Sequence, residues 1–421
     1  MSDAAPALTP PSKPLAIRAL NAAGAALRAL GLPLVRLGEA SLLAEASRKT
    51  GLDDFGDPRF REPLRLLLGS LEREAALTTL GRVIARRDVL RLLENRLRME
   101  SVHRAHPEIA AAPVPAPLFI VGLPRTGTTI LYELLAQDPE SRVPMSWEVQ
   151  HPWPPPEAAT YDTDPRIADV DAHLAGVDRI LPDFKKIHPM GARLPQECVA
   201  LTAHDFASLI NHTTHRVPTY QRWLDTTDLR WVYASHRRQL QYLQWKVPAR
   251  RWVLKSPGHL WALEALAAIY PDARIVQTHR DPLKVVASLT SLVTVLRSLA
   301  SDTIDPYEIS RDWTERLAMG LERAMDVRAR GVFASSHVFD VHFSELMADP
   351  IAMIRRIYAH FDMTLSPPAE ERMRTFLADN AADKHGAHRY TLGAAGLDVE
   401  TERRRYARYQ QHFGIACENI G

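Results

Sequence analysis

The chain has 421 residues, a formal net charge of +2 at pH 7 and two cysteines. A charge so close to balance gives no bulk electrostatic reason to expect nucleic acid as a partner. The length suits either one elaborated domain or two. Cys198 and Cys417 lie far apart and form no metal or redox motif, which is consistent with a reducing cytoplasm. The sequence does not indicate an oligomeric state.

The N-terminal part is expected to be helical. Residues 1–13 are rich in proline, alanine and serine, which is typical of a frayed tail, and residues 14–116 show helical apolar spacing without a strand signal. Residues 14–36 contain arginines and many leucines but no acidic residue. Such a basic amphipathic segment can lie on the inner face of a membrane or pack against the rest of the chain, and the second is its more ordinary use. No apolar run reaches transmembrane length.

The segment that follows has the pattern of an anion cradle. Residues 118–121 are apolar and predict a buried parallel strand, and a loop with Gly122 and Gly127 leads from it into a helix. The loop amides and the helix N-terminus then point at one place and attract an anion. The glycine spacing matches a nucleotide P-loop, but Thr128 replaces the lysine of that motif, and Arg125 is the cation inside the loop. We therefore predict a phosphate site that does not hold the β- and γ-phosphates of a triphosphate.

The next part of the chain combines a short strand with a long insertion. The strand is expected from residue 142, and Glu148 is expected at its end, where α/β enzymes commonly carry catalytic groups. A rigid proline-rich loop follows. Residues 157–248 are predicted to be a helical insertion that forms a lid or binds the acceptor, with one of its helices at residues 195–210.

A β-α-β unit with strands at residues 251–255 and 274–280 completes the expected core. Lys255 and His259 follow its first strand, and Arg280 ends its second. Because ligands of open parallel sheets bind at the carboxyl ends of strands, these side chains should converge with the glycine loop.

The order of elements predicts an α/β, P-loop-like three-layer fold with a central parallel sheet, together with the helical N-terminal region and the helical insertion. The core is assigned to residues 117–366. Residues 367–421 are assigned to C-terminal helices and a basic loop that covers a cofactor.

Four segments occur here in the order in which sulfotransferases that use 3′-phosphoadenylyl sulfate carry them. They are residues 124–129, Trp147-Glu148, residues 254–259, and residues 279–282 followed by Ser288. The chain resembles this family over about residues 118–365 and is most similar to the bacterial branch related to tyrosylprotein sulfotransferases. The resemblance implies transfer of a sulfuryl group from this donor to a hydroxyl group, without a metal ion.

The resemblance also implies roles for individual residues. The 5′-phosphosulfate of the donor would be bound by the loop residues Pro124, Arg125, Thr126, Gly127, Thr128 and Thr129. Its 3′-phosphate would be bound by Arg280 and Ser288, with Arg389 of the basic loop as a looser match. Lys255 corresponds to a lysine near the transferring group, and with Arg125 it would stabilise charge on the leaving phosphate.

The general base that the acceptor hydroxyl needs is open between two residues. Glu148 matches a catalytic glutamate of the tyrosylprotein branch, and the surrounding loop favours it. His259 lies near the position of a catalytic histidine in cytosolic sulfotransferases. Each also has an ordinary alternative, a salt bridge for Glu148 and a helix cap for His259. Glu197 is a third carboxylate, for which a structural pairing with an arginine is expected.

The predicted function is sulfuryl transfer to a small hydrophobic acceptor, such as a lipid or natural product, by a cytoplasmic protein whose residues 14–36 could contact a membrane. The alternatives are a P-loop NTPase or kinase, against which Thr128 argues, and a catalytically inactive nucleotide-binding protein.

Overall fold

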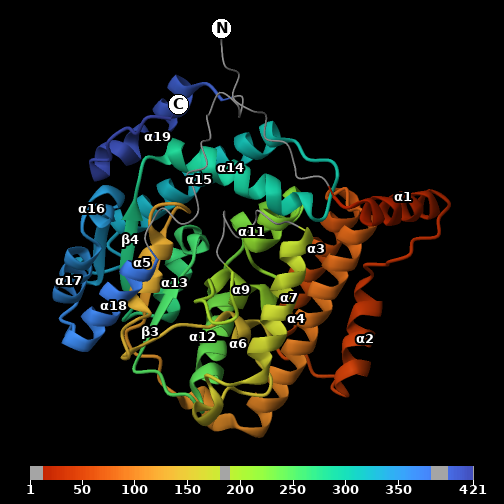
Figure 1. The fold of residues 1–421 in the computed structure, drawn as a ribbon, viewed down its shortest axis with the longest axis horizontal. Coiled ribbons are helices and arrows are strands. Elements are labelled where there is room, and N and C mark those ends of the chain that lie inside the picture. Colours follow the sequence, from red (N-terminus) through yellow and green to blue (C-terminus); the bar gives the residue numbers. More distant parts are fainter. Residues whose placement is uncertain (1–12, 181–189, 381–396, 421) are drawn as a thin grey trace.

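A five-stranded parallel sheet lies in the left half of Figure 1, with helices on either side. The computed structural model describes residues 13–180, 190–380 and 397–420. The strand order is β2-β3-β1-β4-β5. The strands are β1 Leu118–Gly122, β2 Ser141–Arg142, β3 Arg251–Lys255, β4 Arg274–His279 and β5 Val338–His342. The α/β fold class with a central parallel sheet is therefore confirmed.

The register of the sheet brings three strand ends together. Central β1 is buried along its whole length, as a parallel strand covered on both faces should be. Ile120 of β1 lies opposite Lys255 of β3, and Gly122 lies opposite Thr278 of β4. Because β3, β1 and β4 are neighbours that run in the same direction, the segments that follow them emerge at one edge of the sheet.

Helices cover both faces of the sheet and complete three layers. Leu118 and Ile120 of β1 belong to a core with α5, α16, α17 and α18, whereas Phe119 and Val121 belong to a core with α12, α13, α14, α15 and α19. These helices are α5 Thr128–Leu135, α12 Arg230–Gln244, α13 Leu263–Ile269, α14 Pro282–Ser298, α15 Pro306–Ala329, α16 Phe343–Ala348, α17 Pro350–His360, α18 Pro367–Asp379 and α19 Val399–Phe413. The 3₁₀ turns η5 Pro257–Trp261 and η6 Ser335–His337 precede α13 and β5.

The N-terminal region and the insertion add further helices. The first contains α1 Leu15–Ala29, α2 Glu39–Thr50, η1 Pro58–Phe60, α3 Arg61–Arg73, α4 Thr79–Ala105 and η2 Pro107–Ala111. The second, together with the segment before it, contains α6 Ser146–Gln150, η3 Ala158–Thr160, α7 Pro165–Ile180, α9 Cys198–Thr202, η4 Ala203–Asp205, α10 Ile210–Thr214, α11 Pro218–Thr226 and α12. The domain boundaries expected from the sequence stay a prediction.

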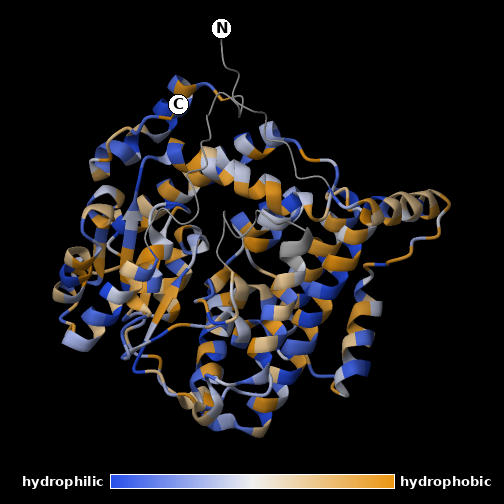
Figure 2. Cartoon of the chain, viewed as in Figure 1, coloured by the Kyte–Doolittle hydropathy of each residue, from blue (hydrophilic) through white to orange (hydrophobic). Residues whose placement is uncertain are grey.

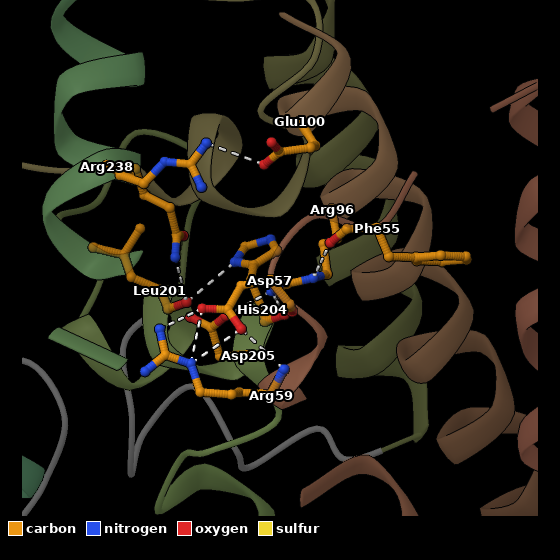
Figure 3. A network of polar contacts seen from close by, with 10 residues as sticks. Phe55, Asp57, Arg59, Arg96, Glu100, Leu201, His204, Asp205 and Arg238 are labelled. Atoms are coloured by element: carbon orange, nitrogen blue, oxygen red, sulfur yellow. Dashed lines mark hydrogen bonds and ion pairs between the residues drawn. The ribbon is translucent and has the colours of Figure 1, made fainter. Parts of the chain in front are cut away.

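One apolar core joins these two groups of helices. Leu64 and Leu93 of the N-terminal region share it with Phe206, Tyr220 and Val232 of the insertion. A polar network reinforces the junction (Figure 3). In it, Arg96 of α4 donates to the Asp205 carboxylate over 2.5 Å and to the carbonyl oxygen of Phe55 over 2.6 Å.

Two local expectations were wrong. Glu148 does not end a strand, because β2 has only two residues and Glu148 lies in the short helix α6. Residues 195–210 do not form one helix, because Phe206 adopts a left-handed conformation with φ +56°. The hydroxyl of Tyr220 stabilises this break, since it donates to the Phe206 carbonyl oxygen and accepts from the Ser208 amide.

Helix α1 packs in an unexpected way. Its buried residues are Asn21 and Gly24, and the Asn21 side chain accepts a hydrogen bond from the Leu80 amide of α4. Leucines of α1 and of the segment after it are exposed: Leu15, Leu20, Leu30, Leu32 and Leu34. In Figure 2 this part of the chain forms a largely apolar projection at the right edge. The fully buried contacts of the helix with the body are therefore made by a polar and a small residue, whereas Leu15 and Leu20 are left exposed.

Candidate active site

The glycine loop is held in shape by steric and hydrogen-bonding constraints. Gly122 has φ +151°, and a Cβ there would lie 2.2 Å from Thr278 Oγ1. Thr126 is fully buried and its Oγ1 donates to the Leu123 carbonyl oxygen over 2.6 Å and shares a 2.6 Å hydrogen bond with Thr278. Gly127, with φ +87°, leads directly into α5. The loop thus turns from β1 into the helix with a fixed backbone.

The six loop residues predicted to bind the donor do not all face outward. Arg125, with φ +66°, and Thr129 are exposed, whereas Thr126 and Thr128 are buried. Pro124 and Gly127 are half-buried. The buried threonines stabilise the loop, so Arg125, Thr129 and the backbone amides are the groups able to meet an anion.

Lys255 emerges from β3 beside this loop. Its side chain is almost fully buried, and its Nζ forms an ion pair with the carboxylate of Glu197 and lies 5.7 Å from the centroid of the Tyr132 ring in α5. Glu197 precedes α9 and keeps 21% of its side chain exposed. The sequence predicts an arginine as the partner of Glu197; the structure places Lys255 against its carboxylate, and this pair joins the insertion to the end of β3.

Arg280 stands on the other side of the loop, after β4. Its Nη1 donates to the carbonyl oxygen of Arg125 over 2.9 Å, so the two predicted anion sites touch. Its guanidinium lies 3.9 Å from the centroid of the Phe343 ring and forms two hydrogen bonds with the carboxylate of Glu418, of 2.7 and 2.8 Å. Ser288 is half-buried in the following helix, α14. Arg389 lies outside the described residues.

Glu148 lies in a different environment from the one expected. Its carboxylate is fully buried and accepts two hydrogen bonds of 3.0 Å from Arg142, one of 2.9 Å from the Met145 amide and one of 3.2 Å from the Tyr161 hydroxyl. Burial raises the pKa of Glu148, and the charge of Arg142 opposes this effect. The Glu148 carboxylate is therefore part of an ion pair with Arg142. A salt bridge is the ordinary alternative to a catalytic role, but this pair lies in the interior and not on the surface.

His259 lies on the opposite face of β1 from α5. Its Nδ1 is 2.6 Å from the Tyr233 hydroxyl, and its ring meets Phe119 edge-on at 5.1 Å. Its Nε2 has no hydrogen-bond partner among the described residues. Burial lowers the pKa of His259 well below 6.5, with a smaller contribution from His236, so the imidazole is neutral at pH 7. Ser256, and not His259, caps the 3₁₀ turn.

A cavity of about 50 Å³ lies beside His259. Its walls come from the insertion and from the segment after β3, and include Cys198, Leu209, Leu229, Ser256 and Trp261. Gln221 is also among the residues that line the cavity, and its side-chain oxygen accepts no hydrogen bond within the described part of the chain. The cavity thus has largely apolar walls, and two of its lining residues, Gln221 and His259, each carry a buried polar atom without a hydrogen-bond partner among the described residues.

Sequence reasoning did not identify Arg142, Phe343 or Glu418 as parts of this region. Contacts between segments far apart in the chain, such as Arg280 with Glu418, leave no periodic or motif signal in one sequence. No three histidine, cysteine, aspartate or glutamate side chains gather as a metal site would require in residues 13–180, 190–380 and 397–420. A metal-free reaction stays a prediction.

Known proteins resemble the chain both in sequence and in structure. Residues 117–367 match the model of the sulfotransferase family. The structure of sulfotransferase STF9 from Mycobacterium avium is 32% identical, with a TM-score of 0.84 over 90% of this chain and 98% of the other. STF1 from Mycobacterium tuberculosis H37Rv is 35% identical, with a TM-score of 0.79 over 88% of this chain and 98% of the other.

A curated relative is the omega-hydroxy-beta-dihydromenaquinone-9 sulfotransferase Stf3 of Mycobacterium bovis. It is 26% identical over 66% of this chain and 70% of its own length. These matches favour the sulfotransferase prediction over an NTPase or kinase. The family model matches residues 117–367, which are more than half of this chain. The chain therefore belongs to the sulfotransferase family, whose members transfer sulfur-containing groups.

Proposed function

We propose that this enzyme moves a sulfuryl group from 3′-phosphoadenylyl sulfate to a hydroxyl of a small, hydrophobic acceptor. The observation that carries the proposal is the meeting of three strand ends: the loop after β1, Lys255 of β3 and Arg280 after β4 lie on neighbouring strands. Arg280 also contacts the loop directly, at the Arg125 carbonyl oxygen. Two linked cationic sites suit a donor with a phosphate at each end.

The reaction is an in-line displacement at sulfur. The acceptor oxygen forms a bond to sulfur as the bond between sulfur and the bridging phosphate oxygen breaks, which leaves adenosine 3′,5′-bisphosphate. Negative charge develops on that bridging oxygen. Arg125, Thr129, the loop amides and Lys255 are the groups that would stabilise it. The proton of the acceptor hydroxyl goes to a general base of the enzyme.

Three side chains compete for the role of general base. We favour Glu197, because it is a partly exposed carboxylate beside Lys255, the residue expected nearest the transferring group. Glu148 remains an alternative, although Arg142 already binds both of its oxygens. His259 is the second alternative, since it lines the cavity and is neutral at pH 7, provided that its proton resides on Nδ1 and leaves Nε2 free.

The cavity beside His259 supports the expectation that the insertion binds the acceptor. Its apolar walls suit a hydrophobic molecule, and the unpaired Gln221 and His259 atoms could orient a polar group. Stf3 is named for a hydroxylated menaquinone, which is a lipid. A lipid or lipid-like alcohol is therefore the first acceptor class to test.

The exposed leucines around α1 support contact with the inner face of a membrane. Leu15 and Leu30 are 78% and 74% exposed, and exposed Arg18 and Arg36 lie in the same acid-free segment. Apolar side chains beside arginines suit an anionic bilayer, where a lipid acceptor would also reside. None of the helices in the described part of the chain is long and apolar enough to cross a bilayer.

Two experiments test these proposals. The first measures binding of adenosine 3′,5′-bisphosphate by calorimetry and transfer of labelled sulfate to a panel of lipid alcohols and phenols; absence of nucleotide binding would reject the donor. The second compares wild type with a Leu30→Ser/Leu32→Ser/Leu34→Ser variant on phosphatidylserine vesicles, with phosphatidylcholine vesicles as the control. Equal sedimentation of both proteins would reject the membrane surface.

A further inference from the structure

The segment after α19 returns to the end of β4. Gly414, with φ +63°, reverses the chain, and Ile415 and Ile420 pack against the main core. Between them, the Glu418 amide donates to the Asp281 carboxylate over 2.7 Å, and Lys284 donates to the Asn419 carbonyl oxygen over 2.8 Å. Residues 415–420, here called the tail, are therefore docked by specific contacts, close to the end labelled C in Figure 1.

The tail places a carboxylate on Arg280. Glu418 Oε1 accepts from Arg280 Nε over 2.7 Å, and Oε2 accepts from Nη2 over 2.8 Å. This paired geometry uses the edge of the guanidinium that would bind two oxygens of a phosphate. The third contact of Arg280, from Nη1 to the Arg125 carbonyl oxygen, and the Phe343 ring fix the plane of the guanidinium. Arg280 cannot offer this edge to Glu418 and to a phosphate at once.

We propose that Glu418 is an internal competitor for the phosphate that Arg280 binds. The inference rests on the proposed function, in which that phosphate is the 3′-phosphate of the donor. Donor binding then requires the carboxylate to leave Arg280, and its return helps adenosine 3′,5′-bisphosphate to dissociate after transfer. The Arg280–Glu418 pair keeps 18% and 33% of its side chains exposed, so it is a contact that a more highly charged phosphate can displace.

Population arithmetic gives the size of the expected effect. If the carboxylate occupies Arg280 in about nine molecules of ten, the measured affinity for the nucleotide is about tenfold weaker than the intrinsic one. Glu418→Gln should therefore bind adenosine 3′,5′-bisphosphate several-fold more tightly than wild type, by about tenfold at most under this assumption. Glu400→Gln removes the same charge at an exposed position of α19 and should bind as wild type does.

The neighbouring cysteine offers a second measurement. Cys417 is exposed, whereas Cys198, the other cysteine, is buried, so a thiol reagent reports on the tail. Saturating nucleotide should change the rate of Cys417 alkylation in the full chain, because Glu418 leaves Arg280. A Cys417→Ser variant should lose this signal, which identifies its source.

The outcomes separate this inference from the proposed function. Loss of nucleotide binding in Arg280→Ala, tighter binding in Glu418→Gln and a nucleotide-dependent Cys417 rate would support it. Equal affinities of Glu418→Gln and wild type, or weaker binding in Glu418→Gln, would overturn it while leaving the donor site intact. If Arg280→Ala binds the nucleotide as wild type does, the phosphate assignment itself is wrong and the competitor role is rejected with it.

Discussion

Arg142 and Glu148 meet edge to edge in the interior, with Nη1 3.0 Å from Oε1 and Nη2 3.0 Å from Oε2. The Glu148 side chain is fully buried and that of Arg142 is 8% exposed. Removal of one partner of such a pair leaves a buried charge without compensation, which is far more costly than replacement of both. This relationship allows the structural and catalytic roles of Glu148 to be separated.

Glu148→Met should lower the free energy of unfolding by about 3–5 kcal/mol, because Arg142 stays charged and buried. The double variant Arg142→Met/Glu148→Met should recover much of this loss. Urea unfolding and sulfuryl transfer are measured on wild type and both variants. If the double variant is stable and active, Glu148 is structural; if it is stable and inactive while Glu197→Gln is active, Glu148 is the base instead of Glu197.

Gly122→Ala should disrupt the glycine loop in two ways, by straining the backbone and by a steric clash with the neighbouring strand. An added Cβ would lie 2.2 Å from Thr278 Oγ1 and 2.9 Å from the Thr278 carbonyl oxygen, on the neighbouring strand. Backbone strain and the steric clash together should lower the free energy of unfolding by about 2–5 kcal/mol, and nucleotide binding should weaken.

Gly331→Ala is the matched control for this variant. Gly331 also has a positive φ, of +67°, but no atom lies within 4 Å of an added Cβ. Gly331→Ala should lower the free energy of unfolding by only about 1–2 kcal/mol and leave nucleotide binding unchanged. Equal stability losses in thermal or urea unfolding of the two variants would contradict the steric explanation.

Arg125→Ala should lower kcat/KM by about 10²–10³, because it removes a cation from the site where charge develops on the leaving phosphate. The side chain is exposed, so the variant should unfold at the wild-type urea concentration. Steady-state kinetics with varied donor provide the measurement, and Arg330→Ala, at an exposed surface pair with Glu264, is the control. An unchanged kcat/KM would remove Arg125 from the reaction.

The stability of the enzyme should fall as the pH decreases below about 6.5. Burial lowers the pKa of His236 in the folded protein to about 3, whereas an unfolded chain has a histidine pKa of about 6.5. Below pH 6.5 the His236 side chain is protonated in the unfolded state but not in the folded state. Its contribution to the free energy of unfolding is therefore fully present above pH 6.5 and is lost progressively toward pH 3. His236 alone should lower the free energy of unfolding by about 2 kcal/mol as the pH decreases from 7.5 to 5.

Urea unfolding of His236→Gln at these two pH values checks the sign. Between pH 7.5 and 5, the free energy of unfolding of the variant should fall by about 2 kcal/mol less than that of wild type, whatever the stability of the variant at pH 7.5. His412→Gln, at an exposed position of α19, should keep the wild-type dependence. A steeper pH dependence in His236→Gln than in wild type would show that the buried imidazole is protonated in the folded state.

The sequence predicted the parts of the site that local patterns encode. The buried run of β1, the glycines and the charged strand ends of β3 and β4 follow from short segments, and the parallel sheet brings them together. The surroundings of Glu148 could not be predicted, because its carboxylate turns back to the Met145 amide and to Arg142. The pairing of Lys255 with Glu197 was missed for a similar reason, since it depends on how the insertion folds over the sheet.

The exposed leucines of α1 show a further limit of pattern reasoning. Amphipathic spacing indicates that an apolar stripe exists but does not say what covers it. Here close packing of Gly24 against Thr79 and the hydrogen bond of Asn21 determine which side of the helix faces the body.

The core shared by the N-terminal helices and the insertion has a consequence for the use of this enzyme as a module. The part that matches the family model begins at residue 117, yet Phe206, Tyr220 and Val232 bury their side chains against residues that precede it, such as Leu64 and Leu93. A chain cut at that point would expose an apolar surface and lose Arg96, the cation that pairs with Asp205. Swapping or transplanting the segment that carries the chemistry therefore requires α2 to α4 to travel with it.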